Sequence, residues 1–108
     1  PIGANVVGPW WGNRRVDGKR EEIEVDAVAL NKQEKQMLAV ECKWQGNVSA
    51  ESIVERLLEK TGSINWQNTK RIESFGVFAK SFKKKITEFQ GKKVFCFDLG
   101  DIEKVLRK

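Results

Sequence analysis

Two apolar runs, residues 23–30 and 37–44, are separated by a short polar turn and carry three charged side chains, Asp26, Glu41 and Lys43. Runs of this length and composition are typical of core strands. A charge buried in a core costs several kcal/mol unless it is paired or binds a metal. The fold must therefore pair these three charges, expose them or use them to hold a cation.

The pattern of apolar residues and turn signals predicts one domain with the order strand, strand, strand, helix, strand, helix, strand, helix. The expected strands are 5–7 with 9–11, 21–30, 36–45, 71–80 and 93–99. The expected helices are 50–61, a basic helix at 82–89, and a final one capped by Asp98 or Asp101. We expect a hairpin turn at Asp17-Gly18, an N-cap at Ser49 and a helix stop at Gly62.

These elements indicate an α/β (mixed α+β) fold, with a central mixed sheet of about five strands flanked by helices. The helix at 50–61 connects the strands 36–45 and 71–80, so we expect those two strands to be parallel. Strict alternation along 21–30 places Asp26 and Val28 on one face of the strand, with Val25 on the other.

The chain has no histidine and only two cysteines, Cys42 and Cys96, each inside an apolar run. We expect both to be small buried side chains in a reducing compartment, the cytoplasm. This composition excludes the usual zinc ligand sets and the Ser-His and Cys-His nucleophiles. No run approaches the ~20 apolar residues that span a bilayer, so no membrane partner is expected.

The net charge of +5 lies entirely in residues 51–108, since 1–50 hold seven basic and seven acidic side chains. Between 70 and 93 there are eight basic residues and two acidic ones. Such a segment suits a phosphate backbone, and a solvated lysine-rich surface is the open alternative. The candidate contacts to nucleic acid are Lys80, Lys83, Lys84 and Lys85.

Glu41 and Lys43 are two residues apart on one strand, so their side chains point the same way. Antiparallel pairing brings Asp26 roughly opposite Glu41, with Cβ atoms ~5 Å apart. Neighbouring carboxylates repel unless a proton or a divalent cation lies between them. Hard oxygen ligands favour Mg²⁺ or Mn²⁺, and the backbone carbonyl of Cys42 could complete the site. The alternative is a structural ion pair of Glu41 and Lys43 that is bridged to Asp26.

Asp26, followed after fourteen residues by Glu41-Cys42-Lys43, resembles the motif of the PD-(D/E)XK nuclease superfamily. More narrowly, four segments resemble the C-terminal domain of unknown function that is attached to archaeal-type AAA+ ATPases. These segments are Trp10-Trp11, Glu24-Val25-Asp26, Glu41-Cys42-Lys43-Trp44 and Phe78-Ala79-Lys80-Ser81-Phe82.

The resemblance implies a restriction-endonuclease-like sheet and Mg²⁺- or Mn²⁺-dependent hydrolysis of phosphodiester bonds in DNA. It makes Asp26 and Glu41 metal ligands, Lys43 the catalytic lysine and an AAA+ ATPase the attached or associated partner. It also implies an acidic ligand on a helix before the first strand, which these residues do not show, so this ligand is missing or lies upstream. We expect the chain to be a piece of a longer protein. Lys60 and Gln67 are candidates for a further polar residue that some members carry. The alternative function is a catalytically inactive module that binds nucleic acid or forms a homodimer.

Overall fold

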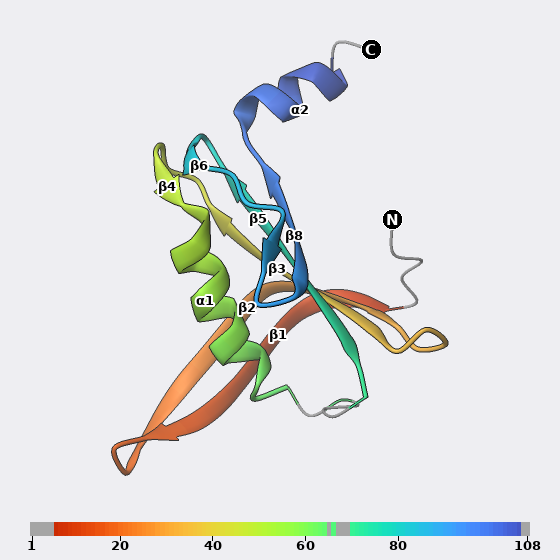
Figure 1. Ribbon diagram of the computed structural model, residues 1–108. Coiled ribbons are helices and arrows are strands. Elements are labelled where there is room, and N and C mark those ends of the chain that lie inside the picture. Colours follow the sequence, from red (N-terminus) through yellow and green to blue (C-terminus); the bar gives the residue numbers. More distant parts are fainter. Residues whose placement is uncertain (1–5, 65, 67–69, 107–108) are drawn as a thin grey trace.

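The computed structural model describes residues 6–64, 66 and 70–106, and its centre is a mixed sheet of six strands in the order β1-β2-β3-β5-β8-β7 (Figure 1). The strands are β1 Val6–Val16, β2 Lys19–Asn31, β3 Gln36–Lys43, β5 Ile72–Ala79, β7 Glu88–Phe89 and β8 Lys92–Phe97. Strands β3, β5 and β8 are parallel, and the remaining neighbours pair antiparallel. A small second sheet pairs β4, Val48–Ser49, with β6, Phe82–Lys84. The predicted α/β (mixed α+β) class is confirmed, with six strands in the main sheet.

The hairpin of β1 and β2 is the longest element of the sheet and extends beyond the helix that covers it (Figure 1). Val16 pairs with Lys19, so the connection is the two residues Asp17 and Gly18. Their φ angles of 50° and 77° are the left-handed values that a tight hairpin turn of this kind requires. The predicted Asp-Gly turn is confirmed.

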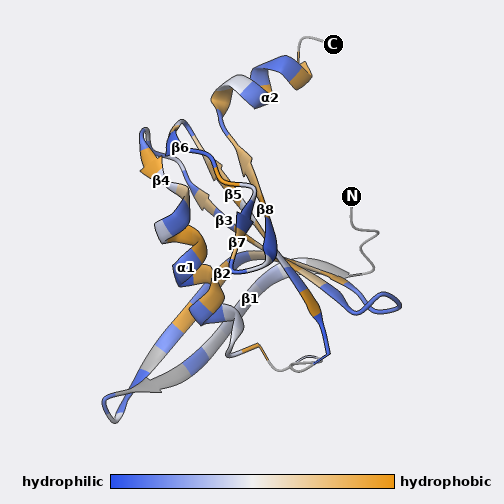
Figure 2. Cartoon of the chain, viewed as in Figure 1, coloured by the Kyte–Doolittle hydropathy of each residue, from blue (hydrophilic) through white to orange (hydrophobic). Residues whose placement is uncertain are grey.

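Helix α1, Ala50–Thr61, connects β3 to β5 and packs on one face of the sheet. It begins where the sequence predicts, because the Ser49 hydroxyl accepts a hydrogen bond from the Ser52 N–H at 3.3 Å. Its apolar stripe faces the sheet, as the hydropathy colouring in Figure 2 shows. The crossover makes β3 and β5 parallel, as expected.

The core lies between α1 and this covered face of the sheet. Its largest side chains without solvent exposure are Val25, Met37, Val54, Leu57, Phe75 and Val77. Burying each contributes about 1.5–3 kcal/mol, so this layer supplies most of the driving force for folding.

A β-bulge in β2 changes the predicted alternation. Val25 pairs with Trp10 while Val28 pairs with Gly8, so Asp26 and Ala27 together lie opposite a single residue of β1. Val25 and Val28 are therefore both buried on the covered face, and the prediction that they lie on opposite faces is wrong. The extra residue shifts the alternation of side chains between the two faces of β2 at the position of Asp26.

The prediction of a basic helix at 82–89 is wrong, because this segment forms β6 and β7 instead. Strand β6 pairs with β4, and β7 joins β8 through the turn Gln90-Gly91, whose φ angles are 51° and 79°. Pairing with neighbouring strands satisfies the backbone of this segment and overrides its weak helical spacing. The predicted strand 93–99 and the predicted final helix are confirmed as β8 and α2, Leu99–Leu106.

The middle of the second face of the sheet is apolar, and no helix among the described residues covers it. It contains a shallow hollow of about 440 Å³ lined by Ala29, Leu38, Val40, Gly76, Phe78, Phe95 and Phe97. The rings of Phe78 and Phe97 stack with centroids 5.1 Å apart. Helix α2 projects away from the end of the sheet and has no buried residue (Figure 1). Neither helix of the described chain is long and apolar enough to cross a membrane.

Candidate functional site

The candidate site lies where the parallel strands β3 and β5 end, at the edge where α/β sheets most often bind ligands. Main-chain hydrogen bonds join the segments that leave these strands. The N–H of Lys80 donates to the Gln45 carbonyl at 3.0 Å, and the N–H of Leu99 donates to the Lys80 carbonyl at 3.2 Å. These bonds fix the ends of β3, β5 and β8 relative to one another.

Asp26 lies at the bulge of β2, and its Oδ2 accepts a hydrogen bond from the Cys42 N–H at 2.8 Å. The last residues of β2 and β3 that pair directly are Ala27 and Val40, so Asp26 and Glu41 follow as the next positions on the two strands. The carboxylate thus takes the place of a main-chain acceptor. Since the N–H and C=O of one strand residue point the same way, the Cys42 carbonyl is also directed toward β2.

Glu41 points to the covered face, where its Oε2 accepts a hydrogen bond from Lys60 Nζ of α1 at 3.2 Å. Its side chain is 22% exposed and that of Lys60 is 28% exposed, so water reaches this ion pair. The structure therefore brings Lys60 to the site. It pairs Glu41 with Lys60, so the alternative ion pair of Glu41 with Lys43 is not the one observed.

Lys43 follows Glu41 on the same face and shares a small hollow with it, of about 30 Å³. The other lining residues are Ile53, Arg56 and Lys60 of α1. One carboxylate thus lies among three cationic side chains. Glu41 and Lys43 therefore lie on the same face of β3, as the alternation of side chains along a strand predicts.

The oxygen atoms at this edge are of the type that hard divalent cations prefer as ligands. Asp26 and Glu41 each use one carboxylate oxygen in the hydrogen bonds above, and the second oxygen makes none within the described chain. The described residues contain no group of three or more His, Cys, Asp or Glu side chains that could hold a metal. Mg²⁺ commonly uses one or two carboxylates with waters, so two carboxylates and the Cys42 carbonyl are a chemically suitable set.

Comparison with known proteins gives one family. The model of DUF234, described as archaea bacterial proteins of unknown function, matches residues 1–56. The chain belongs to this family. The matched part of the DUF234 chain includes β1, β2, β3 and the first half of α1, and so Asp26, Glu41, Lys43 and Arg56. No curated protein and no solved structure matches it.

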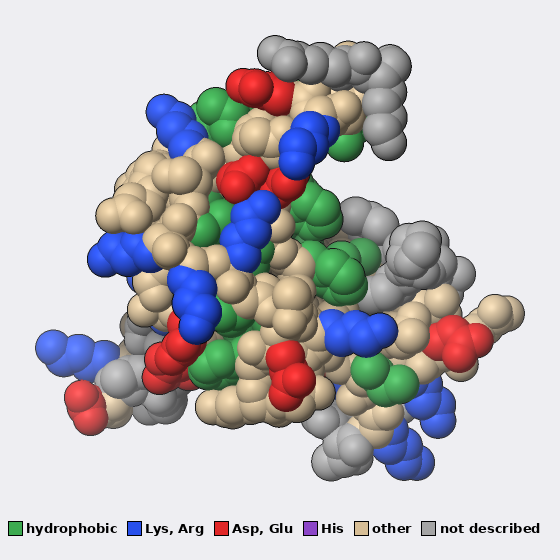
Figure 3. All heavy atoms as spheres, turned by 45° about the horizontal axis from the view of Figure 1, so that its top comes forward, with side chains coloured by type: hydrophobic (Ala, Val, Ile, Leu, Met, Phe, Trp, Pro, Cys, Tyr) green, Lys and Arg blue, Asp and Glu red, His purple; other side chains and the backbone are tan. Residues whose placement is uncertain are grey.

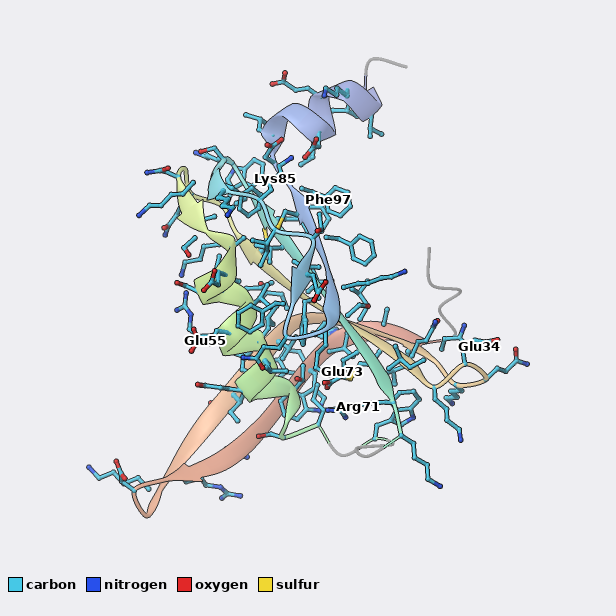
Figure 4. All side chains as sticks on the ribbon, in the orientation of Figure 1. Glu34, Glu55, Arg71, Glu73, Lys85 and Phe97 are labelled. Carbon is cyan, nitrogen blue, oxygen red and sulfur yellow. The ribbon has the colours of Figure 1, made fainter. Side chains whose placement is uncertain are left out.

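The four predicted nucleic-acid contacts of this DUF234 chain do not share one environment. Lys80, Lys83 and Lys84 are exposed and stay predictions. Lys85 instead forms ion pairs with Asp98 Oδ2 at 3.1 Å and Asp101 Oδ2 at 2.5 Å, at the base of α2 (Figure 4). The hydrogen bond from Lys85 lowers the pKa of Asp101 to about 2, and the same bond raises the pKa of Lys85.

The acids that hold Lys85 also cap α2. The Asp101 N–H donates to Asp98 Oδ1 at 2.9 Å, and the Asp98 N–H donates to Asp101 Oδ2 at 3.0 Å. This reciprocal arrangement is a capping box, so the predicted caps are confirmed. Lys85 is engaged in holding the start of the helix, and its pairing with the two acids could not be read from the sequence.

The two cysteines differ from their prediction. Cys42 is exposed, because β3 turns it away from the face that α1 covers, and Cys96 is half-buried with its thiol 3.5 Å from the Ile86 carbonyl oxygen. The prediction that both thiols are buried is wrong. Gln67, the other candidate on the segment after β3, lies outside the described residues.

Sequence reasoning missed a buried ion network at the opposite end of β5. The Arg71 side chain, 4% exposed, donates to Glu73 Oε2 and to the main-chain carbonyls of Thr61, Ile64 and Trp66 (Figure 4). Lys92 Nζ lies 3.2 Å from the other oxygen of Glu73. This network ties the end of α1 to the sheet and has a structural role. The only signal in the sequence was the Arg-x-Glu spacing at the start of a strand.

Proposed function

We propose that this chain is a metal-dependent nuclease-like domain that hydrolyses phosphodiester bonds in DNA. The observation that carries the proposal is the position of Asp26, whose carboxylate is bound to the main chain of Cys42 beside Glu41. A strand bulge and a strand end together produce this juxtaposition. The motif that resembles the PD-(D/E)XK superfamily supports the choice of chemistry.

In this proposal Asp26, Glu41 and the Cys42 carbonyl hold Mg²⁺ or Mn²⁺. The bound ion would activate water and neutralise charge that develops on a phosphate. Lys43, on the same face as Glu41, holds a phosphate oxygen or orients the attacking water. Lys60 restrains the Glu41 carboxylate through its 3.2 Å hydrogen bond.

We also propose that the domain works with an attached or associated AAA+ ATPase. Support comes from the four sequence segments that resemble the ATPase-linked domain. Copurification of the chain with an ATPase from its own cell tests the association. Recovery of the chain without any ATPase would argue against it.

Cleavage of a supercoiled plasmid in Mg²⁺ or Mn²⁺ tests the chemistry. We expect nicked or linear product with the unchanged chain, and at least a hundredfold less with Lys43→Ala. Asp26→Asn is the sharper variant, because its amide oxygen still accepts the Cys42 N–H while the negative charge is lost. An unchanged rate in both folded variants, or no cleavage of any nucleic acid by the unchanged chain, would contradict the proposal.

A second candidate is a non-catalytic module that binds nucleic acid or forms a homodimer. The Glu41–Lys60 ion pair favours it, because this pair neutralises the carboxylate without any metal. This reading predicts DNA binding or self-association that survives Asp26→Asn, with no cleavage in any metal. Loss of a nuclease activity in folded Asp26→Asn protein would exclude it.

A further inference from the structure

A second hollow adjoins the small one beside Glu41. It has a volume of about 190 Å³ and lies between the end of β3 and the first turns of α1. Lys43, Ile53 and Arg56 line both hollows, so the two form one groove. We call it the α1 groove.

The α1 groove has a positive charge that no acid balances. Glu41 is its one lining carboxylate and is already paired with Lys60. Lys43 and Arg56 have no ion pair within the described chain. Two cations therefore face this groove without a protein counter-ion, which makes it suited to an anionic ligand.

The fold fixes the spacing of these groups. Ser52, Arg56 and Lys60 follow one another at four-residue intervals, so they lie along one stripe of α1. The adjacent stripe, which includes Ile53 and Leu57, is buried against the sheet. The helix is thus held with its basic stripe beside Lys43 of β3.

The basic segment around β6 is the competing surface. Lys83 and Lys84 are exposed there, and Lys85 is committed to Asp98 and Asp101. The α1 groove has an advantage over that segment, because its cations converge on a hollow next to Glu41. A phosphate placed there would lie beside the residues assigned to the chemistry.

We infer that the α1 groove binds a backbone phosphate of the DNA substrate, with Arg56 as its main ligand and Lys43 as the second. The inference rests on the proposed function and specifies where the DNA strand lies on the protein. The planar guanidinium of Arg56 presents paired N–H donors that match two phosphate oxygens. Ser52 and Gln45 add polar side chains to the groove along which the DNA strand would lie.

Anisotropy of a labelled 20-base-pair DNA in EDTA and 20–200 mM salt tests the inference without any cleavage. We expect Arg56→Ala to weaken binding roughly tenfold at low salt, since it removes charge-assisted hydrogen bonds to one phosphate. The slope of log affinity against log salt should become shallower by about 1. Arg56→Lys keeps the charge but not the paired donors, so its affinity for DNA should lie between that of the unchanged chain and that of Arg56→Ala.

Lys104→Ala is the matched control, because it removes one exposed cation from α2, away from the groove. It should bind like the unchanged chain, and thermal unfolding should show that every variant is folded. The inference is overturned if the unchanged chain does not bind, if Arg56→Ala binds equally well, or if Lys104→Ala weakens binding as much. Failure of the nuclease proposal is distinct: it would appear as normal, Arg56-dependent binding with no cleavage in Mg²⁺ or Mn²⁺.

Discussion

The two faces of the central sheet have opposite characters at the end where the candidate site lies. The covered face packs apolar residues under α1 and then, at the end of β3, presents Glu41 and Lys43 to the same helix. No helix of the described chain lies over the open face, yet this face exposes Phe95 and Phe97, each 40% accessible, beside the ring of Phe78. In Figure 3, hydrophobic side chains lie at the surface among charged ones.

This contrast favours the covered side of the sheet as the place of the proposed chemistry. Charges under a helix are costly unless they are paired or used, whereas exposed aromatic rings are tolerated more easily. Near the end of β3 on the covered face, the pairing of Lys60 with Glu41 offsets that cost. The charged end of the covered face is therefore the better candidate for function than the larger apolar hollow.

The largest expected difference between the faces comes from one matched pair of substitutions. Phe75 is fully buried on the covered face, and Phe95 lies on the open face of neighbouring β8. Phe75→Ala should lower the free energy of unfolding by about 3–5 kcal/mol, because it leaves a cavity in the core. Phe95→Ala should cost about 1 kcal/mol or less, because its ring already contacts water.

Urea unfolding followed by circular dichroism measures both values. Similar losses for the two variants would show that the open face is packed in solution as tightly as the covered one. That result would break the contrast between the faces.

The next effect tests what holds α1 over the covered face. Arg71→Met should lower the free energy of unfolding by about 3–5 kcal/mol, since it leaves Glu73 and three carbonyls without this partner. Lys70→Met, a neighbouring exposed cation, is the control and should change little. Equal midpoints of urea unfolding for both variants would show that the Arg71 network does not hold α1 on the sheet.

Much of the covered layer could be predicted from sequence. Helix α1 has the predicted bounds, because its apolar spacing and the Ser49 cap agree. The neighbouring positions of Asp26 and Glu41 follow from strand pairing. The bulge at Asp26 could not be predicted, because it arises from pairing with β1 across a whole strand.

The remaining errors have the same origin. Strand β6 pairs with β4, which is distant in sequence, and β7 pairs with β8 across a two-residue turn. The local spacing of apolar residues in 82–89 does not show the distant partner. The contacts of Lys60 with Glu41 and of Arg71 with the end of α1 connect residues on different elements. Side-chain partners across elements depend on the tertiary fold, so charge patterns alone did not identify them.

A smaller effect concerns the capped base of α2, outside both faces. Asp101 has a pKa near 2 in the folded chain, below its ordinary 3.8, because Lys85 donates a hydrogen bond to it. A lowered folded pKa gives stability that is present above pH 4 and is lost as pH falls toward 2. Asp101→Asn should flatten this part of the pH dependence, while Glu103→Gln, an exposed acid of the same helix, should not.

Thermal unfolding between pH 2 and 5 provides the measurement. Because the pair is exposed, the shift in midpoint should be small. An Asp101→Asn curve that follows the unchanged chain through pH 2–4 would contradict the role of the Lys85 hydrogen bond.

The central claim is that Asp26, Glu41 and the Cys42 carbonyl hold a divalent cation, and Mn²⁺ titration of the ¹⁵N-labelled chain tests it most directly. The paramagnetic ion should broaden the amide signals of Asp26, Cys42 and Lys43 first, while those of β7 and α2 persist. Asp26→Asn should abolish the selective broadening, and excess Mg²⁺ should reverse it. Uniform broadening across the chain, or identical broadening in Asp26→Asn, would contradict the claim.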